Sequence, residues 1–189
     1  SGYISEVGVE LYQKMLKNEI NRLQENINYD DIDNDWSPQI KISRNVAIPE
    51  YYIPDTSIRL NLYRKLADLR KVSQVHELKK ELTDRYGLIP NETLELLDVI
   101  KLKIMCRNIG IEKIDSGTKG ILFTFKKDVK YDVSNILEFI NKNKTRYSIK
   151  PNNKIFYKNK LAETMVKTSS IEYIIESLGK ISNKNARNI

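Results

Sequence analysis

Residues 111–125 read IEKIDSGTKGILFTF, and this stretch decides the fold class. After a turn bounded by two glycines, Ile121, Phe123 and Phe125 alternate with other residues. Such alternation next to a short turn predicts a β-hairpin with one buried face. The residues before the hairpin follow a helical period instead, so the sequence predicts an α+β fold in which helices come first and strands follow.

Three amphipathic helices are predicted before this hairpin. Asp55 or Ser57 can cap the first, Ser73 can cap the second, Asn91 opens the third, and Gly87 ends the second. Their inner faces consist of apolar residues three and four positions apart, namely Ile58, Leu62, Leu66 and Leu69, then Val75, Leu78 and Leu82, then Leu94, Leu97, Ile100 and Ile104. Because short turns join these helices, we expect a small helical subassembly.

Further elements are predicted on both sides of this core region. A strand that is interrupted near Arg44 and Asn45 is expected over residues 39–48, because apolar residues alternate there. Beyond the hairpin the pattern predicts a helix over 133–140, a second hairpin that turns at 151–153, and a last helix over 169–179. Ser169 and Glu172 have capping-box spacing at the start of that last helix, and Gly179 is expected at its end.

The chain is expected to have four parts. Residues 1–27 carry one apolar helical stripe, and residues 28–38, NYDDIDNDWSP, hold four aspartates and no basic residue, which indicates a linker. Residues 39–182 then form a compact domain, and 183–189 form a flexible polar tail. The predicted fold class is thus α+β, with an N-terminal amphipathic helix and linker before several helices packed with short antiparallel strands.

Composition limits the classes of protein. The chain has 189 residues, of which 40% are apolar and 30% charged, and no apolar run approaches the ~20 residues that cross a bilayer. One cysteine and one histidine supply neither an internal disulfide nor a structural zinc site. These features predict a cytoplasmic protein with no membrane partner and no bound metal.

Basic residues gather in one window of the sequence. Lys and Arg number 32 against 25 Asp and Glu, a net charge of +7, and residues 126–160 alone hold ten basic and three acidic residues. A weak, salt-sensitive nucleic-acid face is one interpretation. Its candidate residues are Lys142, Lys144, Arg146, Lys154 and Lys158. An ordinary solvated surface is the alternative, because lysine reads bases poorly.

Acidic residues gather on one face of the second predicted helix. Glu77, Glu81 and Asp84 are three to four residues apart and therefore lie opposite its apolar side. This face is typical of a surface that docks on a basic partner. Local neutralisation by Lys80 and Arg85 is the alternative interpretation.

No catalytic motif is found. The sequence has no phosphate-binding loop, no dinucleotide fingerprint, no HExxH and no CxxC, so we expect no cofactor and no small-molecule substrate. His76 has no nucleophile motif near it, and Cys106 lies among apolar helical residues, where a buried thiol packs as a small hydrophobe. The sequence therefore predicts that this chain is not an enzyme.

Several motifs together carry a family resemblance. They are IPDTSIRLNLYRKLA at 53–67, ELTDRYGLIP at 81–90 and KGILFTF at 119–125, in that order. The run from Ile48 to Phe125 resembles the C-terminal domain of the bacterial transcription-repair coupling factors, the Mfd family. The opening residues, SGYISEVGVELYQKML, are similar to the stretch after the last motor motif of that ATP-dependent DNA translocase.

The resemblance implies a regulatory role in transcription-coupled DNA repair. In that family the C-terminal domain masks the domain that binds the excision-repair subunit UvrA until the motor engages stalled RNA polymerase on DNA. Residues 1–27 would then be the tail of the translocase module, and 39–182 the regulatory domain. The resemblance also implies that Glu81 and Asp84, with Glu77 beside them, face arginines of the masked domain. A basic nucleic-acid-binding module remains the alternative function.

Overall fold

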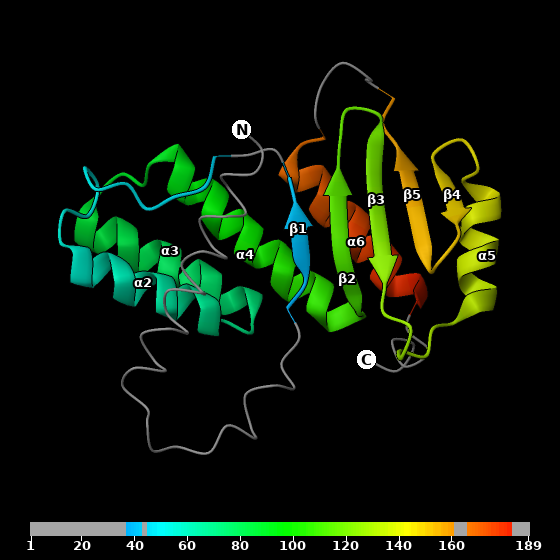
Figure 1. The fold of residues 1–189 in the computed structure, drawn as a ribbon, viewed down its shortest axis with the longest axis horizontal. Helices are drawn as coiled ribbons and strands as arrows, with labels where there is room; N and C mark the ends of the chain where they lie inside the picture. Colours follow the sequence, from blue (N-terminus) through cyan, green and yellow to red (C-terminus); the bar gives the residue numbers. More distant parts are fainter. Residues whose placement is uncertain (1–36, 43–44, 161–165, 183–189) are drawn as a thin grey trace. The chain divides into compact units, whose positions relative to one another are not determined.

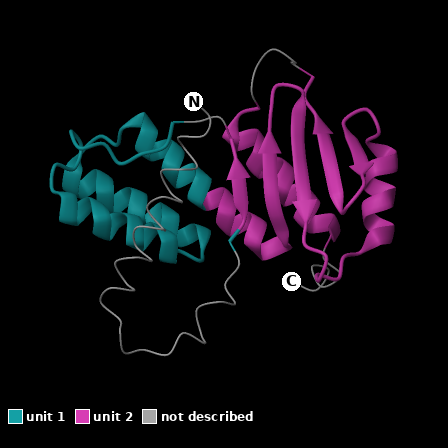
Figure 2. Ribbon diagram, viewed as in Figure 1, with its two compact units in different colours: residues 1–37, 43–100 teal, residues 38–42, 101–189 magenta. Residues whose placement is uncertain are grey.

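The described part of the chain forms two compact units. The computed structural model describes residues 37–42, 45–160 and 166–182. Unit 1 contains the described residues up to Ile100 except 38–42, and unit 2 contains 38–42 and those from Lys101 onward (Figure 2). The helix predicted before residue 27 and nearly all of the acidic linker lie outside the described residues, so the four-part division remains a prediction.

Unit 1 is built from helices. They are α2 (Thr56–Asp68), α3 (Val72–Tyr86) and the first part of α4 (Asn91–Ile109) (Figure 1). Asp55 caps α2 as predicted, because its carboxylate accepts the Ile58 N–H at 2.9 Å. The predicted cap of α3 at Ser73 is wrong. The helix begins at Val72 with Lys71 as its N-cap. The Gln74 side-chain oxygen accepts hydrogen bonds from the backbone N–H groups of Arg70 and Lys71, which stabilises this earlier start.

The core of unit 1 follows the predicted helical faces in part. Ile58, which was predicted to face inward, is 40% exposed, and Leu69 and Leu94 are only partly buried. The buried core residues on the three helices are Leu62 and Leu66, then Val75, Leu78 and Leu82, then Leu96, Leu97 and Ile100. The strand predicted over residues 39–48 is confirmed only for residues 39–41, because the described residues 45–48 form no strand. Ala47 donates its N–H to the Glu92 carbonyl at 3.2 Å and accepts the Thr93 hydroxyl at 2.9 Å, so helix α4 takes the place of a neighbouring strand.

Unit 2 contains a five-stranded mixed sheet. Its strands are β1 (Gln39–Lys41), β2 (Ile111–Ser116), β3 (Gly120–Phe125), β4 (Tyr147–Lys150) and β5 (Lys154–Lys158). The spatial order is β1-β2-β3-β5-β4, and every neighbouring pair is antiparallel except β1 and β2. Both predicted hairpins are confirmed, and the α+β class is confirmed with them. The sequence predicted only antiparallel strands. This prediction is wrong for β1, which pairs with β2 in parallel.

One face of this sheet is the core of unit 2. The register aligns Ile40, Ile114, Phe123 and Ile155 across the strands, and all four are buried. Helix α6 (Thr168–Ser182) lies behind the sheet in Figure 1, and α5 (Val133–Lys142) lies beside β4. The apolar side of α6 is buried as predicted through Ile171, Ile174, Ile175 and Leu178.

The predicted bounds of α6 are wrong at both ends. The helix begins at Thr168, so Ser169 and Glu172 form no capping box; instead Glu172 accepts a hydrogen bond from Lys101 of α4 at 2.7 Å. Gly179 lies within the helix, which continues to Ser182. A Cβ at this glycine would lie 2.9 Å from the Ile109 side chain, so close helix packing, and not helix termination, explains the residue.

Candidate interaction surface

Helix α3 presents the three predicted carboxylates on one side of unit 1. Glu77 and Asp84 are exposed, and Glu81 is partly buried between them. The inward residues Val75, Leu78 and Leu82 fix this orientation, because their burial turns the opposite side of the helix to solvent. Within the described part of the chain, neither Glu77 nor Asp84 makes an ion pair.

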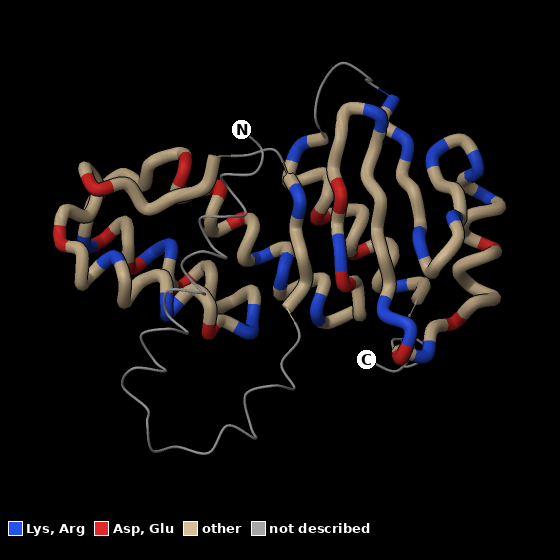
Figure 3. The backbone as a smooth tube through the Cα atoms, in the orientation of Figure 1, with Lys and Arg blue, Asp and Glu red and all other residues tan. Residues whose placement is uncertain are grey.

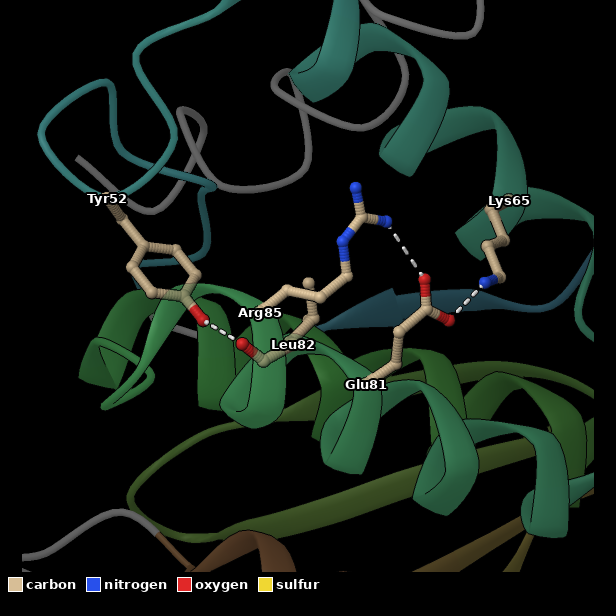
Figure 4. A network of polar contacts seen from close by, with 5 residues as sticks. All are labelled: Tyr52, Lys65, Glu81, Leu82 and Arg85. Carbon is tan, nitrogen blue, oxygen red and sulfur yellow. Dashed lines mark hydrogen bonds and ion pairs between the residues drawn. The ribbon is translucent and has the colours of Figure 1, made fainter.

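Glu81 is held by two cations of its own unit. Its Oε2 accepts a hydrogen bond from Lys65 Nζ of α2 at 2.5 Å, and its Oε1 lies 3.3 Å from an Arg85 guanidinium nitrogen (Figure 4). The predicted local neutralisation is therefore confirmed for Arg85 at Glu81, whereas Lys65 of α2 takes the place of the predicted Lys80. These contacts are exposed, so each contributes only about 0–1 kcal/mol.

These cations also fix the charge of Glu81. The hydrogen bond from Lys65 is the largest cause that lowers the pKa of the Glu81 carboxyl below its usual value of 4.5, and Arg85 adds to it, while burial opposes the shift. At neutral pH the group is therefore ionised. It offers a partner a carboxylate whose orientation is already set.

A hollow of about 290 Å³ lies between α2 and α3 beside this carboxylate. Its apolar lining includes Ile58, which is 40% exposed, together with Leu62 and Leu82. Lys65, Glu81 and Arg85 line its polar side. The α2–α3 groove thus combines a small apolar floor with charged walls, an arrangement that fits one long amphipathic side chain from a partner.

Tyr52, in the segment before α2, contacts the C-terminal half of α3. Its hydroxyl donates to the Leu82 carbonyl at 3.2 Å (Figure 4), and its ring meets Tyr86 edge to face at 5.9 Å between centroids. Burial raises the Tyr52 pKa, so the hydroxyl stays protonated and able to donate. This contact fixes the C-terminal half of α3, where Glu81 and Asp84 lie.

Sequence reasoning missed Lys65 and Tyr52. Lys65 is 16 residues from Glu81, beyond the reach of any rule for pairs within one helix. Equal distance from the turn between α2 and α3 would pair Lys65 with a residue near Val75, so the rule for helices joined by a tight turn does not point to Glu81 either. No local signal points to Tyr52, whose partner is a backbone carbonyl.

The five predicted basic residues of unit 2 do not form one cluster. Lys154 and Lys158 lie on β5, and Arg146 lies beside Lys158, whose N–H donates to the Arg146 carbonyl at 2.7 Å. Lys142 ends α5 and pairs with Glu138 at 2.6 Å, and Lys144 lies in the following turn. The structure thus brings Arg146 and Lys158 together, places Lys154 at the other end of the same strand, and leaves Lys142 and Lys144 apart.

The groups that could perform chemistry are poorly placed for it. His76 is exposed on α3, and Cys106 is fully buried in α4, where desolvation raises the pKa of its thiol far above the ordinary value. A search of the described residues finds no cluster of three or more His, Cys, Asp or Glu side chains suited to a metal ion. Among those same residues, no helix is long and apolar enough to span a membrane.

Comparisons with known proteins point to one family. Residues 42–136 match the family described as the TRCF domain. The transcription-repair-coupling factor of Rickettsia typhi is 36% identical over 171 residues, which cover 90% of this chain and 15% of that protein. The protein of the same name from Escherichia coli is 28% identical over 127 residues, 66% of this chain and 11% of that protein. The chain thus spans about one-seventh of the length of these curated relatives.

A solved structure shares the fold. The crystal structure of the C-terminal domain of a transcription-repair coupling factor superposes with a TM-score of 0.61 at 16% identity. The match covers 80% of this chain and 98% of that one. This likeness supports the arrangement of elements described above.

Proposed function

The chain belongs to the family of transcription-repair-coupling factors that share the TRCF domain, and from this premise we propose that it is a non-catalytic regulatory domain of a DNA repair translocase. In this proposal it is the C-terminal part of a longer protein. It covers the UvrA-binding domain of that same protein until the motor engages stalled RNA polymerase on DNA. The observation that carries the proposal is the row of three carboxylates on α3 beside the α2–α3 groove.

The carboxylates on α3 favour a partner with positive charge. Glu77 and Asp84 have no ion pair within the described residues, and Glu81 uses only exposed contacts with Lys65 and Arg85. A partner with arginines or lysines at matching spacing gains contacts with all three carboxylates. An arginine fits best, because its guanidinium binds a carboxylate in two places while its stem packs on the apolar floor of the groove.

The proposed interface with the masked domain must be reversible. A cover that must open is held by contacts that are individually weak, and exposed ion pairs contribute about 0–1 kcal/mol each. Within one polypeptide the tether raises the effective concentration of the partner, so a few such contacts suffice to close the interface. Differential binding elsewhere in the protein then shifts the population to the open state.

Charge reversal in the full-length parent protein tests the proposal. Glu81→Arg with Asp84→Arg should raise UvrA binding about 10-fold in the absence of nucleotide and polymerase, because loss of about 1.4 kcal/mol of closing free energy is tenfold in population. Glu50→Arg with Asp68→Arg makes the same charge change on exposed residues of unit 1 outside α3 and should leave UvrA binding as in the wild type. Equal UvrA binding by wild type and the Glu81/Asp84 variant would contradict the proposal.

A further inference from the structure

The sheet of unit 2 has a second face that no helix of this unit covers. Helices α5 and α6 lie behind or beside the strands in Figure 1, and the front of the sheet has no described element of unit 2 over it. The burial pattern agrees. Ile114, Phe123 and Ile155 on the helix-covered side are buried, whereas Leu122 and Phe156 on the other side are partly exposed. An antiparallel sheet with one solvated face is normally polar on that side.

This face is rich in lysine. The register places Lys113, Thr124, Lys154 and Lys150 in one row across the strands, and Lys41, Asp115, Leu122, Phe156 and Ser148 in the next. Lys158 follows Phe156 by two residues and therefore points to the same side. We call Lys41, Lys113, Lys150, Lys154 and Lys158 the lysine face. Two acidic residues lie on the described strands of this face, namely Asp115, which pairs with Lys113 at 3.3 Å, and the exposed Glu112, which follows the buried Ile111. The face therefore carries a net charge of +3.

An aromatic ring lies among these lysines. Phe156 packs against Gly120 of the neighbouring strand, where an added Cβ would lie 2.6 Å from the Phe156 ring. The Lys150 ammonium lies 5.8 Å from the centre of the same ring. Leu122 adjoins Phe156 in the register and extends the apolar surface. A partly exposed ring surrounded by cations on an open sheet is an arrangement on which nucleic-acid bases stack.

A buried hydroxyl adds a second unexplained feature. Thr124 lies in the lysine row between Lys113 and Lys154, and it is 8% exposed. Its Oγ1 has no hydrogen-bond partner within the described residues. Buried polar atoms are normally paired, so an unpaired hydroxyl beneath a row of cations indicates a position that a polar ligand group can reach when the lysine side chains move.

From these observations we propose that the lysine face binds single-stranded nucleic acid, with the ammonium groups on phosphates and Phe156 beneath a base. Three strand spacings separate Lys113 from Lys150, about 14 Å, which is the length of about four stacked nucleotides. The flat ring favours a nucleic acid over an acidic peptide, because every base has an aromatic face and acidic side chains have none. Sequence selectivity is not part of the proposal, since lysine acts here as a point charge.

Salt dependence gives the first test. Anisotropy of a labelled oligothymidylate of about 12 nucleotides measures binding to the 189-residue chain. If about four phosphates are neutralised, affinity should fall about 50-fold between about 50 mM and about 200 mM salt. Absence of binding at the lower salt concentration would overturn the proposal.

Charge reversal at matched positions gives the second test. Lys154→Glu with Lys158→Glu should weaken oligothymidylate binding by more than about 10-fold, because it reverses two cations on the lysine face. Lys127→Glu with Lys130→Glu makes the same change in the loop between β3 and α5 and should weaken binding by less than about 3-fold. Equal losses in the two variants would show that net charge alone matters, and the lysine face would then be no binding site.

The ring and the class of partner need their own controls. Phe156→Ala should weaken binding about 5-fold or more through lost stacking, and Phe156→Tyr, which keeps the ring, should bind as the wild type does. Thermal unfolding checks that each variant is folded. Poly-glutamate of the same charge should compete poorly with oligothymidylate. Equal competition would assign the face to an acidic protein and overturn the proposal of nucleic acid.

Discussion

The two units differ sharply in charge. The described residues of unit 1 hold 8 Lys and Arg against 9 Asp and Glu, a net charge of −1, whereas those of unit 2 hold 18 against 7, a net charge of +11 (Figure 3). The net charge of +7 for the whole chain hides this division. One chain therefore presents an acidic helix face on a nearly neutral unit and a basic sheet face on the other.

Because the two units differ in charge, their surfaces suit different partners. In our two proposals, the carboxylates on α3 bind a basic protein surface, and the lysine face of unit 2 binds phosphates. The charged contacts that the units make internally differ as well. In unit 1 the Lys65–Glu81 pair is 49% and 39% exposed, whereas in unit 2 the Lys101–Glu172 pair is 23% and 20% exposed. Three sets of variants test this difference between the units.

The largest effect is expected from a glycine exchange in each unit. Gly120→Ala would place a Cβ 2.1 Å from the Tyr157 carbonyl oxygen, so the variant should lose about 3 kcal/mol in unit 2. Gly87→Ala has open space around it, but its φ of +78° and ψ of −146° lie in a region that is essentially restricted to glycine, so the exchange should cost unit 1 about 1–3 kcal/mol through backbone strain alone. Amide hydrogen exchange measures the loss of stability of each unit in both variants. Loss of amide protection in unit 2 with unit 1 unchanged is expected for Gly120→Ala, and equal loss in both units would show that they unfold as one.

An intermediate effect is expected at the pair between α4 and α6. Glu172→Ala removes the acceptor of Lys101 in a partly buried position and should lower the free energy of unfolding by about 1.5 kcal/mol. Glu176→Ala removes an exposed carboxylate from the same helix and should change it by less than about 0.5 kcal/mol. Urea unfolding compares the two. A similar loss in both variants would mean that burial does not strengthen the pair.

The smallest effect is expected at Glu81 and depends on pH. Its folded-state pKa lies below the usual 4.5, so the ionised group stabilises unit 1 fully above pH 4.5 and loses this contribution as the pH falls through the folded-state pKa. Glu81→Gln should therefore cost less than about 1 kcal/mol at neutral pH and almost nothing near pH about 3. Asp84→Asn is the control, because Asp84 has no ion pair within the described residues. A cost of Glu81→Gln that grew in acid would contradict the assigned sign.

Much of the fold was predictable because its periods are local. The alternation through Ile121, Phe123 and Phe125 predicted β3, and the helical spacing of Val75, Leu78 and Leu82 predicted the buried side of α3. What failed depends on contacts distant in sequence. The insertion of β5 between β3 and β4, the parallel pairing of β1, and the replacement of a strand near Ala47 by contacts with α4 leave no local periodic signal.

The candidate surfaces were predictable only in part. Helical spacing placed Glu77, Glu81 and Asp84 on one face, but the pairing of Glu81 with Lys65 requires the packing of α2 against α3. In unit 2 a window of basic residues did not distinguish Lys154 on the sheet from Lys142 on a helix end. The strand register makes that distinction, because it decides which side chains share a face.

The most direct test of the central claim is a calorimetric titration of this chain with the separately expressed UvrA-binding domain of its parent protein. The account predicts that the two bind in trans, that the affinity falls with rising salt, and that Glu81→Arg with Asp84→Arg weakens it about 10-fold or more. Absence of binding, or equal affinity of the wild type and this variant, would contradict the claim that the acidic face of α3 holds the masked domain.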